Sequence, residues 1–141
     1  MNDSGTVRQS DHTWKPPDNG VLKINFDASY IDKNMFSGWG LISRDVAGNS
    51  SGLQGGACSA IDPEQAEAHA LLESVIWAKQ KGWRKIVLEG DCQNVMTAAN
   101  GKSYAVKWTT QNVVKDAIFL LSSFVEWKCK YVRRFSYLVL L

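Results

Sequence analysis

The chain has 141 residues, of which 45% are hydrophobic, and its formal net charge is +2. This length predicts one domain with a substantial core rather than two domains, and the small charge excludes the strongly basic proteins whose binding is dominated by phosphate contacts. The three cysteines have no metal-ligand spacing, which predicts reduced thiols. Residues 1–13 lack the apolar segment of a secretory signal, and the closing YLVLL is far shorter than the roughly 20 residues of a membrane span. We therefore expect a cytoplasmic or nuclear protein.

Three strands are predicted in the first part of the chain. Residues 21–29 alternate between apolar and polar side chains, which predicts the first strand. Residues 38–45 and 50–58 flank a Gly48-Asn49 turn, in which glycine and asparagine tolerate positive φ. The two segments therefore predict a hairpin that follows the first strand in a meander.

The clearest helix covers residues 60–83. Asp62 is a suitable N-cap, and Pro63 suits the first helical position. Gln65 stands where the partner in a capping box would lie, and Gly82 can end the helix.

The rest of the chain alternates between strands and helices. Three consecutive apolar residues within 84–91 predict a fourth strand that is covered on both faces. A short helix is expected at 92–101 and a longer one at 107–123, and alternation in 124–134 predicts a fifth strand. In that strand Val125, Trp127, Cys129 and Tyr131 alternate with Glu126, Lys128 and Lys130. The order β-β-β-α-β-α-α-β predicts a mixed sheet with helices on its faces.

Three carboxylates stand in unusual places. Asp27 ends the first strand and Asp91 ends the fourth, although a turn residue and an N-cap explain them almost as well. Glu67 lies on the helix face made by small and apolar residues, where it needs either an ion-pair partner such as Lys23 or a cation. If the first and fourth strands are parallel neighbours, all three side chains converge at one edge of the sheet. Oxygen donors without histidine or cysteine indicate Mg²⁺ or Mn²⁺.

Four motifs in this order and spacing carry a resemblance to a known family, namely WKPPDNGVLKINFDAS, GWGLISRDVAGN, AEAHALL and LEGDCQNV. Over residues 14 to 133 the chain resembles the ribonuclease H type 1 domain of the plant branch, which is related to the ribonuclease H of non-LTR retroelements. The resemblance implies an α/β fold of the ribonuclease H-like kind, a five-stranded mixed sheet with helices on both faces. Residues 1–13 are polar and aperiodic, which predicts a disordered segment, and residues 14–141 would form the domain.

The resemblance also implies a function, which is nucleic-acid binding and metal-dependent, endonucleolytic hydrolysis of the RNA strand of RNA/DNA hybrids. Asp27, Glu67 and Asp91 match the family's catalytic, metal-binding carboxylates, which would hold two Mg²⁺ or Mn²⁺ ions, the second weakly. Ala28, Ser29 and Gln93 match positions close to the RNA strand. The supporting positive charges, which read equally well as solvated surface, are Lys102, Lys107, Lys128, Lys130, Arg133 and Arg134.

The chain departs from the family pattern after Arg133. Family members continue into a final helix with a fourth metal-binding aspartate, whereas RFSYLVLL contains no acid. We therefore expect a domain that is truncated or divergent after Arg133, with its last helix missing and its activity weak. The apolar face left by that helix favours self-association or a protein partner. His12 and His69 are both expected at the surface, without the role of the family's histidine.

Two hypotheses remain open. In the first, the protein is a nuclease of the ribonuclease H type. In the second, it is a catalytically impaired domain that binds nucleic acid or another protein.

Overall fold

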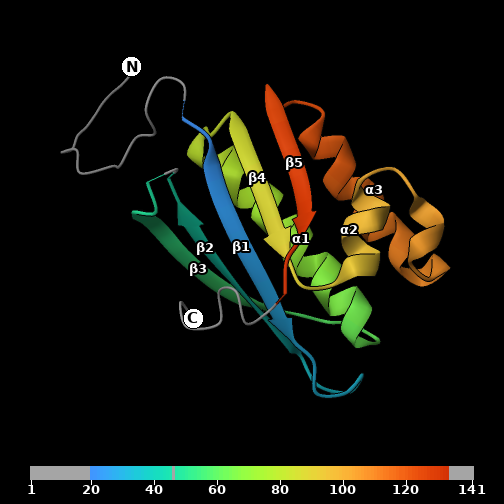
Figure 1. Cartoon of the computed structure of the whole chain (residues 1–141). Coiled ribbons are helices and arrows are strands. Elements are labelled where there is room, and N and C mark those ends of the chain that lie inside the picture. Colours follow the sequence, from blue (N-terminus) through green and yellow to red (C-terminus); the bar gives the residue numbers. More distant parts are fainter. Residues whose placement is uncertain (1–19, 46, 134–141) are drawn as a thin grey trace.

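The computed structural model describes residues 20–45 and 47–133, and the statements below refer to these residues. Five strands form one sheet in the order β3-β2-β1-β4-β5 (Figure 1). The strands are β1 (Leu22–Ser29), β2 (Ser37–Arg44), β3 (Ser50–Cys58), β4 (Lys85–Gly90) and β5 (Glu126–Tyr131). The helices are α1 (Pro63–Lys81), α2 (Gln93–Ala99) and α3 (Trp108–Leu121), with a short 3-10 helix η2 (Ser103–Ala105) that the sequence did not predict.

The sheet is mixed, as the sequence predicted. Strand β1 runs antiparallel to β2, and β2 runs antiparallel to β3. Strand β4 runs parallel to both β1 and β5. The hairpin between β2 and β3 closes where expected, because Gly48 adopts a positive φ of 89° that glycine tolerates without strain.

Helix α1 covers one face of the sheet and packs against β1, β2, β4 and α3. The alternation in β1 places Leu22, Ile24 and Phe26 in the core, each at most 1% exposed, while Lys23 is exposed on the other face. In Figure 1 the described helices lie behind and beside the sheet, and none lies in front of it. Residues 134–141, where the family's last helix would begin, lie outside the described ranges, as do residues 1–19. The expectations for these segments, including His12, are therefore not tested.

The burial of β5 and β4 is less regular than their sequence patterns. In β5, which is an edge strand, Cys129 is buried but Tyr131 is 46% exposed, and Val125, directly before the strand, is 58% exposed. In β4, Ile86 and Leu88 are buried, whereas Val87 on the opposite face is only partly covered.

The start of α1 follows the predicted capping pattern with one difference. The Asp62 Oδ1 accepts a hydrogen bond of 2.8 Å from the backbone N–H of Gln65. The Gln65 Oε1 in turn accepts one from the backbone N–H of Ile61, the residue before the N-cap, rather than from Asp62 itself. Gly82 ends the helix with a left-handed φ of 77°. Among the described residues, no helix is both long and apolar enough to cross a membrane.

Removal of the cap gives a testable prediction for stability. Asp62→Ala is expected to lower the free energy of unfolding by about 1 kcal/mol, because the backbone N–H of Gln65 in the first turn loses its acceptor. The ion pair between the Asp62 Oδ2 and the Lys107 Nζ at 3.2 Å adds little, since the lysine side chain is 65% exposed. Urea denaturation measures the change. Asp116→Ala, on the exposed side of α3, is the control, and equal stability of the two variants would refute the capping role.

Candidate active site

Two carboxylates lie at the carboxyl ends of neighbouring parallel strands. Asn25 in β1 is the register partner of Glu89 in β4. Asp27 lies two residues beyond Asn25, and Asp91 lies two residues beyond Glu89. Both side chains therefore reach the same edge of the sheet, and each remains partly exposed.

A third carboxylate comes from α1. Glu67 is 8% exposed and lies on the face of the helix that buries Leu71, Ser74 and Ala78, as the sequence predicted. The amino-terminal end of α1 lies near the carboxyl ends of β1 and β4 (Figure 1). This end is held in place by α3, because the Gln65 Nε2 donates a hydrogen bond of 3.0 Å to the backbone carbonyl of Thr109.

These three side chains form one cluster. Each of Asp27, Glu67 and Asp91 offers a carboxylate oxygen, and the three oxygens lie within 4.8 Å of one another. In the residues 20–45 and 47–133, this is the one group of three or more acidic, histidine or cysteine side chains with such spacing. Like charges at this separation repel one another, and a divalent cation would offset the repulsion. The donor set fits a hard cation such as Mg²⁺ or Mn²⁺, since it contains only oxygen.

The lysine considered as a partner of Glu67 lies elsewhere. The Lys23 Nζ is 3.4 Å from the Glu89 Oε2, so Lys23 pairs with a different carboxylate. The explanation of Glu67 as half of an ion pair with Lys23 is therefore wrong. The reason is the alternation of β1, which turns Lys23 away from the face that α1 covers.

Cys92 directly follows Asp91. Burial raises the pKa of the Cys92 thiol above its ordinary value, backbone hydrogen bonds from Val95 and Asn94 act in the opposite direction, and the charges of Glu67 and Glu64 raise it further.

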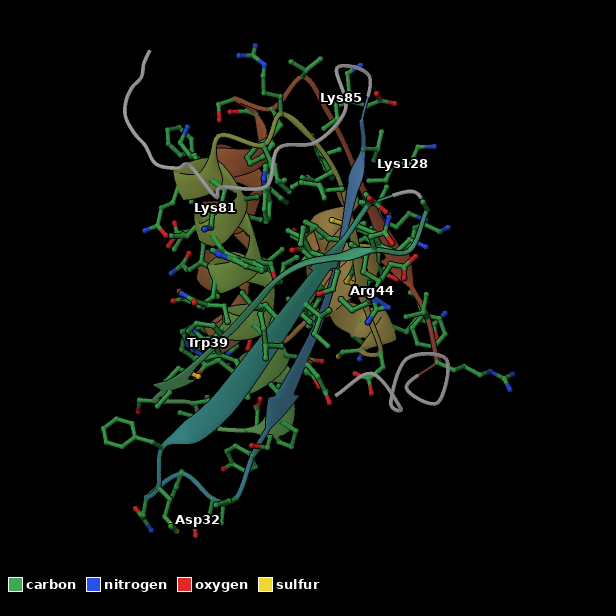
Figure 2. The ribbon with its side chains drawn as sticks, turned by 90° about the vertical axis from the view of Figure 1, so that its left-hand side faces the viewer. Asp32, Trp39, Arg44, Lys81, Lys85 and Lys128 are labelled. Carbon is green, nitrogen blue, oxygen red and sulfur yellow. The ribbon has the colours of Figure 1, made fainter. Side chains whose placement is uncertain are left out.

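The residues expected near the RNA strand lie within two positions of Asp27 or Asp91 in the chain. Ala28 donates its backbone N–H to the Asp27 Oδ1 at 2.9 Å. Asp27, Ala28 and Ser29 line an open groove of about 360 Å³ together with Trp39. Figure 2 shows Trp39 on the side of the sheet that α1 occupies. Gln93 is exposed at the start of α2, two residues beyond Asp91.

The residues expected to supply positive charge lie at the surface where the structure describes them. Lys102, Lys107, Lys128, Lys130 and Arg133 are all exposed, and Arg134 is outside the described residues. His69 is half-buried on α1 rather than at the surface, and burial lowers its pKa while Glu73 acts in the opposite direction.

Sequence reasoning missed a buried polar pair next to the site. Asn25 and Glu89 are 4% and 7% exposed. The sequence analysis singled out neither residue, because nothing local in the sequence indicates that these two positions are covered. A prediction that included the register between β1 and β4 would have brought them together.

The comparisons with known proteins come from a family model and from solved structures. Residues 25–137 match the family model described as reverse transcriptase-like. A search of curated protein sequences found no match. The crystal structure of RNase H1 from the archaeon Halobacterium salinarum has a TM-score of 0.75 at 22% identity, and the alignment covers 82% of this chain and 88% of that one.

Two further solved structures give the same result. The amino-terminal RNase H domain of a Mycobacterium tuberculosis protein has a TM-score of 0.72 at 16% identity, covering 81% of this chain and 83% of that one. LC11-RNase H1, isolated from compost and solved in complex with an RNA/DNA hybrid, has a TM-score of 0.72 at 12% identity, covering 82% of this chain and 87% of that one. At these identities the likeness establishes the ribonuclease H-like fold alone.

Proposed function

The chain belongs to the reverse transcriptase-like family, and on that premise we propose that it binds nucleic acid and hydrolyses the RNA strand of RNA/DNA hybrids with Mg²⁺ or Mn²⁺. The observation that carries the proposal is the convergence of Asp27, Glu67 and Asp91, with oxygens within 4.8 Å of one another. The hybrid bound by LC11-RNase H1 supports the substrate class. The four sequence motifs support a place in the plant branch.

The three carboxylates would hold the divalent cation. When bound, such a cation lowers the pKa of water and stabilises the charge that develops on a departing phosphate-ester oxygen. Asp27 and Asp91 are fixed by the ends of two paired strands, and Glu67 is fixed by a helix packed on the same strands. Rigid elements therefore set the direction of each ligand, which is what a preorganised site requires.

The neighbouring residues would position the RNA strand. The groove beside Asp27 is lined by the small residues Ala28, Ser29 and Gly38, so a sugar-phosphate backbone can approach the carboxylates closely. Gln93, exposed next to Asp91, offers a donor and an acceptor to that strand. A 2′-hydroxyl in the shallow minor groove would distinguish RNA from DNA at this position.

A substrate panel tests the proposal. The protein is incubated with Mg²⁺ and end-labelled duplexes of one sequence, namely an RNA/DNA hybrid, an RNA duplex and a DNA duplex. We expect cleavage of the RNA strand of the hybrid alone, because the proposed site requires a 2′-hydroxyl on the strand that it cleaves and none on the opposite strand. Binding of the hybrid without cleavage would favour a catalytically impaired binding module, and equal cleavage of the DNA duplex would contradict the proposed specificity.

A further inference from the structure

Asn25 and Glu89 form a buried polar pair two residues before Asp27 and Asp91, in the same two strands. The Asn25 Nδ2 donates a hydrogen bond of 3.0 Å to the Glu89 Oε1, and both residues are almost fully buried. The Lys23 Nζ lies 3.4 Å from the other carboxylate oxygen of Glu89, and the lysine side chain is 49% exposed. The Glu89 carboxylate therefore has a neutral donor on one oxygen and a cation near the other.

A buried carboxylate of this kind is costly unless it is paired. Loss of the partners of a buried ionised group lowers the free energy of unfolding by roughly 3–5 kcal/mol. Lys130 is the register partner of Glu89 in β5. Arg44 and Lys128 are in register with Lys23, two residues before the row that contains Asn25 and Glu89. Figure 2 shows Arg44 and Lys128 on the side away from α1. Glu89 is thus held between strands by a hydrogen bond from Asn25 and by an ion pair with Lys23, on a face of the sheet that carries further positive charges.

The position of the pair relates it to the site. Strand side chains alternate, so Asp27 follows Asn25 on the same face of β1, about 7 Å further along the strand. Asp91 follows Glu89 in the same way, directly after the last residue of β4. The hydrogen bond between Asn25 and Glu89 therefore joins the two strands just before the point where their carboxylates meet.

We propose that Asn25 and Glu89 are positioning residues for the cation site. Their hydrogen bond fixes the register and spacing of β1 and β4, so that Asp27 and Asp91 stay close together although their charges repel each other in the absence of a cation. The proposal rests on the proposed function, because it assumes that the three carboxylates bind a divalent cation.

Binding of Mn²⁺ to the substrate-free protein, followed by electron paramagnetic resonance, tests this role without any need for hydrolysis. Asn25→Ala and Glu89→Ala are each expected to weaken Mn²⁺ binding by about tenfold, the usual effect of removing a partner outside the ligand set. The double variant is expected to be no weaker than either single variant, since the two residues act through one bond. Glu89→Gln is expected to bind as the wild type does, because its amide oxygen accepts the same hydrogen bond.

The controls separate positioning from general stability and from surface charge. Lys115→Ala removes an exposed lysine on α3 without touching the hydrogen bond and is expected to leave Mn²⁺ binding unchanged. If the alanine variants do not fold, the pair Asn25→Leu and Glu89→Leu replaces both polar groups at once, which leaves neither unsatisfied, and the same tenfold loss is expected.

Two results would overturn the inference. One is unchanged Mn²⁺ affinity in the folded Glu89→Ala or double leucine variant, and the other is Glu89→Gln binding as poorly as Glu89→Ala. Asp27→Asn, measured in the same series, distinguishes the two proposals. If Asp27→Asn binds Mn²⁺ like the wild type, the metal site itself is refuted. If Asp27→Asn fails to bind but the Asn25 and Glu89 variants bind normally, only the positioning role is refuted.

Discussion

Asp27→Asn is expected to lower kcat/KM for hydrolysis of the RNA strand of a hybrid by more than about 100-fold. Removal of a residue that hydrogen-bonds to a metal ligand typically lowers metal affinity or activity by roughly 10- to 100-fold. Removal of a ligand itself is expected to lower activity further. Asparagine keeps the shape of the side chain and removes its charge. The change therefore tests the carboxylate in a cluster whose oxygens lie within 4.8 Å of one another.

The matched control is Asp116→Asn, the same substitution on the exposed side of α3. We expect it to retain wild-type activity, and we expect both variants to melt near the wild-type temperature. Hybrid affinity is measured in parallel by fluorescence anisotropy without divalent cation. Asp27→Asn with undiminished kcat/KM would remove Asp27 from the catalytic set.

Gly90→Ala is expected to lower the free energy of unfolding by about 1–3 kcal/mol, the usual range for overpacking a core. A Cβ at Gly90 would lie 2.4 Å from the Cζ and 2.7 Å from the Cε1 of Phe26. Phe26 is 1% exposed, so its ring has little room to move. Because Phe26 precedes Asp27 and Gly90 precedes Asp91, the same change is expected to reduce activity by disturbing both strand ends.

Gly40→Ala is the control for this prediction. Gly40 is the register partner of Asp27, and a Cβ there would meet no atom within 4 Å. The free energy of unfolding of the Gly40→Ala variant, measured by urea denaturation, is expected to stay within about 0.5 kcal/mol of the wild-type value, as for substitutions without steric conflict. Equal stability of Gly90→Ala and Gly40→Ala would show that the strands can separate enough to admit the methyl group.

Local signals in the sequence were sufficient for most of the fold. Asp62 and Gly82 mark the ends of α1 because capping chemistry is confined to a few neighbouring residues. The turn at Gly48 likewise follows from a positive φ that few residues tolerate. The exposure of Tyr131 could not be predicted in this way, since it depends on β5 lying at the edge of the sheet.

The candidate site was predictable for a related reason. Asp27 and Asp91 stand at strand ends and Glu67 on an apolar helix face, and these positions are visible in the hydrophobic pattern. The Asn25–Glu89 hydrogen bond was not predictable, because it joins residues that are 64 positions apart and depends on the register of two parallel strands.

Removal and return of the cation tests the central claim most directly. The protein is dialysed against EDTA, assayed on an end-labelled RNA/DNA hybrid, and assayed again as Mg²⁺ is added in steps. We predict that the chelated protein leaves the hybrid intact and that Mg²⁺ restores cleavage of the RNA strand in the wild type but not in Asp27→Asn. Cleavage by the chelated protein at an unchanged rate would contradict a metal-dependent site formed by Asp27, Glu67 and Asp91.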